Sequence, residues 1–459
     1  MLKKTAIFVS DHPFIRHLIF LILAILAIWI NGYHFVTFDQ FAHIPFLRKI
    51  INPELYPNDP FLTMRKYHFS YFWYIFIPIA RAGILEVSMF LVHILTVYGT
   101  IWMFWALSEI LFGDPRANLL VTCALIFPHL GFPGFQIIEF SLLNRTFALP
   151  FILGSIWLYL KNKRFLAYLL LGLMLNIHAV YAVYVLCMYL LDEILTFNRS
   201  KWWQPILCLG IFILMGLPVL IWRMQTGSGI DLTLRPEMLS LASSSLLYPV
   251  YYPIGPFSYM IGNFLAGIGT ILAFVLGYRQ AGSSLKHQTM KHFILAIGIL
   301  IFVGILTSYL LPITFLLQFQ ILRTGVFRFF FGMIYLSFFL SSKQYQGELE
   351  TPWFALLALS FIILITPLLT IILWPIFRAF KQTKTRPAWL IPVVIGIQVV
   401  TMIIGLRSRL WSPGWYIYGP QSDWTDIQIW SRNNTPVDAG FITPPYLFGH
   451  YISDSRVFS

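Results

Sequence analysis

Residues 165–196 read FLAYLLLGLMLNIHAVYAVYVLCMYLLDEILT, an apolar run that the polar residues Asn176 and His178 interrupt. A helix needs about 20 residues to cross a hydrocarbon core of about 30 Å, so this run is too long for one crossing. The break predicts two short helices that meet inside a membrane, where protein or a cavity must cover the irregular backbone. The run therefore predicts a polytopic helical membrane protein.

The composition of the whole chain supports this prediction. Of its 459 residues, 58% are hydrophobic and only 11% are charged, whereas a soluble globular protein carries about 25% charged residues. The mean hydropathy is +0.75. A soluble domain could not keep so much apolar surface from water. These values exclude a cytosolic enzyme, a nucleic-acid-binding domain and a disulfide-rich secreted module.

The other apolar runs predict an all-α protein with about eleven or twelve transmembrane helices. Besides the split run 165–196, the candidate spans are 17–36, 86–110, 117–132, 145–160, 203–223, 257–277, 292–311, 321–341, 352–377 and 389–405. Pro367 interrupts one of them. No internal repeat is visible, although a transporter built from two related halves should show one.

Basic clusters predict the orientation, and they account for the net charge of +13. Lys3, Lys4 and Arg16 place the amino terminus in the cytoplasm, together with the clusters 161–164 and 378–387. Beyond residue 291, spans that simply alternate in direction would place the basic cluster 378–387 outside the cell. Either 312–341 or 352–377 must therefore contain a partial crossing. A transmembrane domain, 1–405, then carries external loops at 37–85, 131–144 and 224–256, and an external segment, 406–459, follows. A bacterial plasma membrane is the expected location.

Two acidic residues in the first external loop are candidates for function. Asp39 follows the first span at the bilayer edge, where partial desolvation suits a carboxylate to accept a proton. It is also well placed to cap a helix predicted over Gln40–Ile51, and the two roles are compatible. Asp59 precedes Pro60 in a Pro-rich loop, where an aspartate commonly makes a turn. We take Asp39 as the candidate catalytic residue and Asp59 as a candidate substrate contact.

Further polar residues lie at the edges of the apolar runs or inside them. Glu139 stands alone in its apolar loop and needs a partner, for which Arg145 is the obvious choice, although an acceptor or metal site is the alternative. His178 is either a hydrogen-bonded packing residue or a functional group at membrane depth. Arg323 and Arg328 either bind a phosphate or extend to lipid headgroups. No motif for zinc, nucleotide or dinucleotide binding is present.

The layout resembles the C-type (GT-C) membrane glycosyltransferases: an early external loop with an acidic residue and an interfacial helix, a second external loop after the third span, and an external carboxy-terminal part. The tail is similar to an uncharacterised bacterial family of polytopic proteins with an NTP-x-DA-x-F-x-x-PP pattern. The matching stretches are DWTDIQIW at 423–430, NTPVDAGFITPP at 434–445, Ser455 with Arg456, and LYPNDPF at 55–61. Trp424, Ile427 and Trp430 share a helical face, and 440–443 reads as a short strand.

The resemblance implies an enzyme that transfers a sugar from a polyprenyl-phosphate carrier, with Asp39 as the base and Arg323 or Arg328 at the departing phosphate. A lipid monophosphate would leave with two arginines as counter-charges, whereas a diphosphate would need a divalent metal. The implied partners are this carrier, membrane lipids and an unknown acceptor, without nucleic acid. Two departures are a single Asp39 instead of an acidic pair, and an end at Ser459 where a longer external domain is expected. A lipid or amphiphile transporter and a non-catalytic envelope-assembly protein stay open as alternatives.

Overall fold

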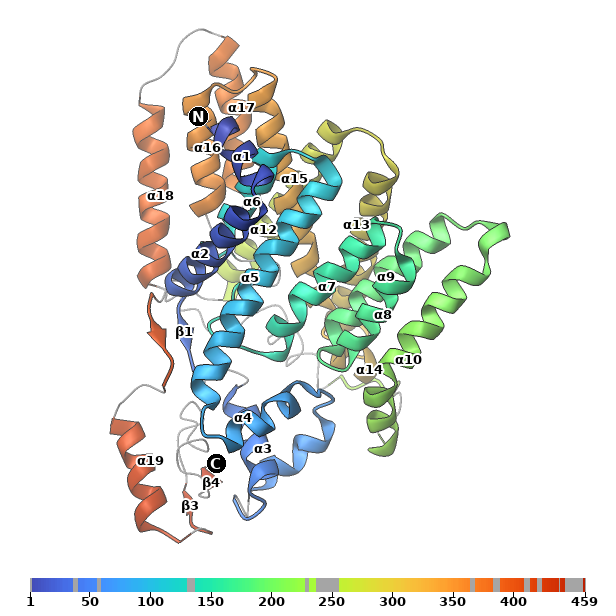
Figure 1. Cartoon of the computed structure of the whole chain (residues 1–459), viewed down its shortest axis with the longest axis vertical. Coiled ribbons are helices and arrows are strands. Elements are labelled where there is room, and N and C mark those ends of the chain that lie inside the picture. The colour runs from blue at the N-terminus through green and yellow to red at the C-terminus, as the bar shows by residue number, and fades with distance from the viewer. Residues whose placement is uncertain are drawn as a thin grey trace.

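The computed structural model describes residues 2–35, 40–55, 59–129, 137–227, 231–236, 256–363, 368–382, 389–407, 413–418, 423–436, 438–441 and 457–458. About 79% of the structure is helical, and most helices lie side by side in one bundle (Figure 1). Among the described residues, 5 helical segments are long and apolar enough to cross a membrane, namely Pro13–Asn31, Leu85–Phe112, Trp203–Gln225, Leu285–Ser308 and Ile321–Tyr345. The chain is therefore an integral membrane protein with an all-α bundle, as its composition predicts.

The bundle contains thirteen helices in the described part of the chain, one more than the upper number predicted. They are α2 (Pro13–Asn31), α5 (Leu85–Phe112), α6 (Pro115–Ala124), α7 (Asn144–Leu160), α8 (Arg164–Leu175), α9 (Ala179–Leu195), α10 (Trp203–Gln225), α12 (Pro256–Ala281), α13 (Leu285–Tyr309), α15 (Gly325–Tyr345), α16 (Thr351–Ile363), α17 (Leu368–Gln382) and α18 (Leu390–Arg407). The run 165–196 is divided into α8 and α9, as predicted. The run 352–377 is divided as well, into α16 and α17, which explains the additional helix.

Shorter helices lie around the bundle. They are α1 (Leu2–Asp11), α3 (Gln40–Ile51), α4 (Ile77–Arg81), α14 (Thr314–Gln318) and α19 (Asp423–Asn434), with the 3₁₀ helices η1 (Pro60–Tyr67), η2 (Phe72–Phe76), η3 (Arg199–Lys201) and η4 (Ile321–Thr324). The helix predicted over Gln40–Ile51 is α3, and the tail helix is α19.

The bundle has two ends, which we name by the segments found there (Figure 1). The amino end holds α1, the turn 161–163 and the loop 196–202, and the tail end holds α3, the segment 137–143 and α19. Because α16 and α17 form a hairpin, α17 runs back to the amino end. Arg378 near its carboxy-terminal end therefore lies at the same end as the basic turn 161–163. The two basic clusters can thus lie on the same side of the membrane, which alternating single crossings did not allow.

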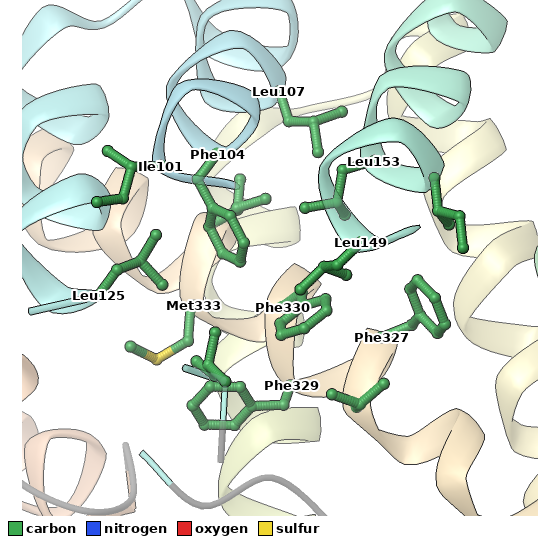
Figure 2. Packing of buried hydrophobic residues seen from close by; sticks show 14 of the residues in the cluster. Ile101, Phe104, Leu107, Leu125, Leu149, Leu153, Phe327, Phe329, Phe330 and Met333 are labelled. Carbon is green, nitrogen blue, oxygen red and sulfur yellow. The ribbon is translucent and has the colours of Figure 1, made fainter. Parts of the chain in front are cut away.

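The centre of the core is α15, whose span is 94% buried in the structure. Figure 2 shows Phe330 of α15 among side chains from α5 and α7, including Phe104 and Leu149. The ring centroids of Phe104 and Phe330 are 5.3 Å apart. On its other side α15 packs against α12, where a Cβ added to Gly277 would lie 2.2 Å from the carbonyl oxygen of Tyr335. This contact needs glycine, since small residues let membrane helices approach closely.

Two short parallel strand pairs connect distant parts of the chain at the tail end. Strand β1 (Tyr33–His34), directly after α2, pairs with β2 (Trp415–Tyr416) after α18. Strand β3 (Gly440–Phe441) pairs with β4 (Val457–Phe458). The strand predicted at 440–443 thus begins at Gly440, while its last two residues lie outside the described part. The first pair fixes the tail to the exit of the first span.

Candidate functional site

Asp39 itself lies outside the described residues, but the residues on both sides of it are placed. The backbone N–H of His34 donates to Phe140 O at 2.7 Å, and the side-chain amide of the buried Gln40 donates to Leu142 O at 2.8 Å. Both carbonyl groups belong to the segment 137–143. The chain after α2 is therefore held against this segment directly before and directly after the stretch that contains Asp39.

The segment 137–143 carries Glu139, which pairs with Arg145 as one of the two sequence interpretations predicts. Arg145 Nε donates to Glu139 Oε1 at 2.7 Å, and Arg145 Nη2 donates to Oε2 at 2.6 Å. Arg145 lies in the first turn of α7, where the helix dipole disfavours a cation. The Glu139 carboxylate compensates for the unfavourable position of this cation. The two parallel hydrogen bonds also fix the segment 137–143 relative to α7.

His178 caps the amino terminus of α9, where the run 165–196 breaks. Its Nδ1 accepts a hydrogen bond from the backbone N–H of Tyr181 at 3.3 Å, and the two rings are 4.5 Å apart. The histidine is 8% exposed. This is the hydrogen-bonded packing role considered for His178, and it also orients the Tyr181 ring beside Phe327 of α15, with centroids 5.4 Å apart.

Arg323 lies in η4, immediately before α15, and α9 fixes the loop that presents it. The buried hydroxyl of Tyr184 is shared between Phe319 O and Gln320 O, both at 2.6 Å. Gln320 has a φ of 47°, a left-handed conformation that is uncommon outside glycine. Such a backbone persists only where its surroundings hold it. The Tyr184 hydroxyl provides this support three residues before Arg323.

Four of these residues are related to Tyr181, three through their charges and one through a ring contact. The charges of Glu139, Arg145 and Arg323 all act on the Tyr181 hydroxyl, although they come from a loop, from α7 and from η4. His178 lies against the same ring. The site therefore contains a neutralised ion pair, a tyrosine hydroxyl and one further guanidinium at the tail end of the bundle. This combination can bind an anionic group, because an arginine side chain offers several directional N–H donors in addition to its charge.

Two of the sequence candidates lie elsewhere. Asp59 is 6% exposed and directly precedes η1, where its backbone carbonyl accepts from Leu62 N at 3.3 Å, in agreement with a turn-making role. Arg328 is 7% exposed between α15 and α12, and a Cβ added to Gly267 would lie 3.0 Å from its Nη2. A guanidinium so deeply buried in protein does not extend to lipid headgroups. The headgroup interpretation is therefore wrong for Arg328.

Asn176 has a structural role at this end that the sequence pattern alone does not show. Its side-chain Nδ2 donates to Met215 O at 2.8 Å, and its Oδ1 accepts from Val219 N at 3.0 Å. These two backbone groups would bond to each other in a regular α-helix. Pro218 interrupts α10 beside them, and the amide bridges the interruption. The nearest signal in the sequence is a polar residue and a proline in two neighbouring apolar runs.

The loop 59–81 covers this junction. Ser70 Oγ donates to Ile177 O at 2.6 Å, and Tyr71 N donates to Asn176 O at 2.8 Å. Irregular backbone between α8 and α9 is thus covered by protein, as the membrane environment requires.

Within the described part of the chain, no group of three or more His, Cys, Asp or Glu side chains is arranged to hold a metal ion. No protein-family profile matches the sequence, and a search of curated proteins returns no match. The fold and the polar site together define an integral membrane protein with a cluster of charged and aromatic side chains at one end of a helical bundle.

Proposed function

We propose that the chain is a GT-C-like membrane glycosyltransferase that moves a sugar from a polyprenyl-phosphate carrier to an acceptor at the external face. The observation that carries this proposal is the Glu139–Arg145 pair on the segment 137–143, together with the electrostatic influence of this pair and of Arg323 on Tyr181. The residue after Asp39 is anchored to the same segment that carries Glu139. A base and a phosphate-binding guanidinium are the two groups that such a transfer needs.

In the proposed reaction, Asp39 accepts the proton of the acceptor hydroxyl while the hydroxyl oxygen attacks the anomeric carbon. The bond between that carbon and the phosphate oxygen breaks, and the polyprenyl phosphate leaves with the electron pair. Arg323 stabilises the charge on the leaving phosphate, since its fork donates two directional hydrogen bonds. Arg145 contributes less net charge because Glu139 neutralises it. We assign the phosphate to Arg323, which lies in η4 directly before α15, in preference to Arg145 or the buried Arg328.

The test uses the purified full chain in proteoliposomes with a panel of radiolabelled polyprenyl-phosphate hexoses and a membrane extract as the acceptor source. We expect transfer of label and release of free polyprenyl phosphate, abolished by Asp39→Asn. Arg323→Lys should lower turnover by about tenfold, because lysine keeps the charge but loses the fork. The control is Arg81→Lys, an exposed arginine at the end of α4, which should leave turnover unchanged.

Equal turnover of Arg323→Lys, Arg323→Gln and the parent protein would contradict the assignment of the phosphate. Movement of intact lipid-linked sugar across the bilayer without release of polyprenyl phosphate would contradict the enzyme and favour the transporter.

A further inference from the structure

A cavity of about 530 Å³ lies at the amino end, far from the candidate site along the same helices. The first turns of α8 and α10 and the last turn of α9 surround it. Its lining includes Lys163, Arg164, Glu193 and Gln204, together with apolar side chains such as Phe165 and Pro205. Nothing in the proposed transfer reaction uses these residues.

Glu193 is the unusual member of this lining. It is 4% exposed, and neither carboxylate oxygen has a hydrogen bond of normal geometry to any described residue. The nearest cation is Arg164, whose Nη1 lies 3.8 Å from Oε1, and the Tyr168 hydroxyl also lies beside the carboxylate. Burying a carboxylate that has only these partners is costly, and the carboxy-terminal turn of a helix disfavours negative charge further.

The preceding residue, Asp192, is a carboxylate in the same turn that does have hydrogen-bond partners. Asp192 Oδ1 lies 2.7 Å from His292 Nδ1, and its Oδ2 accepts from the Tyr159 hydroxyl at 2.9 Å. Asp192 thus has partners from two other helices, whereas Glu193 faces the cavity. A ligand that offers N–H donors would supply the hydrogen bonds that Glu193 lacks.

The mouth of the cavity is positively charged. Lys163 is exposed and lines it, after Asn162 turns the chain with a φ of 60°. Lys161, only two residues earlier, lies instead over the Trp157 ring at 3.8 Å from its centroid. The cavity therefore offers a cation at its mouth and a carboxylate in its interior, which matches a zwitterion with an outer phosphate and an inner ammonium.

The position of the cavity favours a lipid over a soluble zwitterion. Phe197, Trp202 and Trp203 are 59%, 58% and 47% exposed in the loop beside it and at the start of α10. Exposed aromatic residues at helix ends mark the level of lipid headgroups. Phe165 and Leu166 on the outside of α8 are also exposed and line the cavity, so they offer a surface for the start of an acyl chain.

We propose that this cavity binds the headgroup of a glycerophospholipid that carries a primary ammonium, with the ammonium on Glu193 and the phosphate on Lys163 and Arg164. A phosphocholine headgroup fits less well, because its quaternary ammonium has no N–H to donate. An anionic glycerol headgroup has no ammonium to place beside the buried carboxylate.

The test is native mass spectrometry of the full chain in detergent, with phosphatidylethanolamine, phosphatidylcholine and phosphatidylglycerol of identical acyl chains. We expect phosphatidylethanolamine to be retained preferentially, and Glu193→Gln to reduce its preference over phosphatidylcholine by about tenfold, the value of one charge-assisted hydrogen bond. The matched control is Glu348→Gln, at a partly exposed glutamate whose Oε1 lies 2.8 Å from Lys343 Nζ. It should leave the preference unchanged, and an unchanged preference in Glu193→Gln would overturn the proposal.

A second pair of variants keeps the test decisive if Glu193→Gln does not fold. Lys163→Gln changes an exposed residue at the mouth and should weaken retention of phosphatidylethanolamine, whereas Lys161→Gln should not. Equal retention by both variants would overturn the phosphate assignment. Water-soluble glycerophosphoethanolamine should not displace the lipid at equal concentration, and displacement would show that the ligand is a soluble compound instead.

Discussion

Arg145 and Glu139 form two parallel hydrogen bonds, from Nε to Oε1 at 2.7 Å and from Nη2 to Oε2 at 2.6 Å. Their side chains are 11% and 15% exposed, so the pair is mostly shielded from water. The pair joins α7 to the segment that also binds His34 and Gln40. One side-chain pair thus fixes, relative to α7, the segment that binds His34 and Gln40.

We expect Glu139→Gln to destabilise the protein by about 3 kcal/mol, because it removes the carboxylate from a shielded cation at the amino terminus of a helix. The double variant Glu139→Gln/Arg145→Met should lose less than the sum of the two single variants, since neither charge is then left alone. Equilibrium unfolding in detergent micelles measures all three variants. Strictly additive losses would contradict a direct interaction between the two side chains.

Asn176 provides a second prediction, because its amide bonds to both Met215 O and Val219 N. Asn176→Asp keeps the acceptor for Val219 N but loses the donor to Met215 O, while Asn176→Leu loses both. We expect Asn176→Leu to destabilise the protein by about 2 kcal/mol and Asn176→Asp to have a smaller effect. Hydrogen exchange of the Val219 amide should accelerate in Asn176→Leu only. Acceleration to the same degree in both variants would contradict the bridging role.

The sequence predicted the helical bundle well because membrane spans depend on local composition. The break between α8 and α9, the helix Gln40–Ile51 and the pairing of Glu139 with Arg145 all follow from residues that are close together in the chain. The pairing was one of two open interpretations. Its signal was a single carboxylate in an apolar loop, because such a charge is costly to bury without a partner.

Contacts between distant segments could not be predicted in this way. The Tyr184 hydroxyl meets carbonyl groups 135 and 136 residues later, and Asp192 meets His292 across 100 residues. Neither the helix period nor the hydropathy of a run contains information about its partner. The adjacent acidic residues Asp192 and Glu193 inside an apolar run are the sequence feature that could have indicated the polar groups beside the cavity at the amino end.

Two glycines, one at the interface between α12 and α15 and one in α13, should differ in their tolerance of a Cβ atom. A Cβ at Gly277 would lie 2.2 Å from the backbone oxygen of Tyr335, and backbone cannot move aside as a flexible side chain can. We expect Gly277→Ala to destabilise the protein by about 2–3 kcal/mol. A Cβ at Gly298 of α13 would meet nothing within 4 Å, so Gly298→Ala should be neutral or stabilising by about 0.5 kcal/mol. Thermal unfolding followed by circular dichroism compares them, and similar losses would contradict the packing.

The two ends of the bundle predict the accessibility of single cysteines. Glu54 is exposed after α3 at the tail end, and Asn162 is exposed in the turn between α7 and α8 at the amino end. In a background without Cys123, Cys187 and Cys208, a membrane-impermeant maleimide should label Glu54→Cys in intact cells. It should label Asn162→Cys only after the membrane is permeabilised, because short basic loops are in general retained in the cytoplasm. Labelling of Asn162→Cys in intact cells would reverse the orientation and move the candidate site, with Arg323 and the Glu139–Arg145 pair, to the cytoplasmic face.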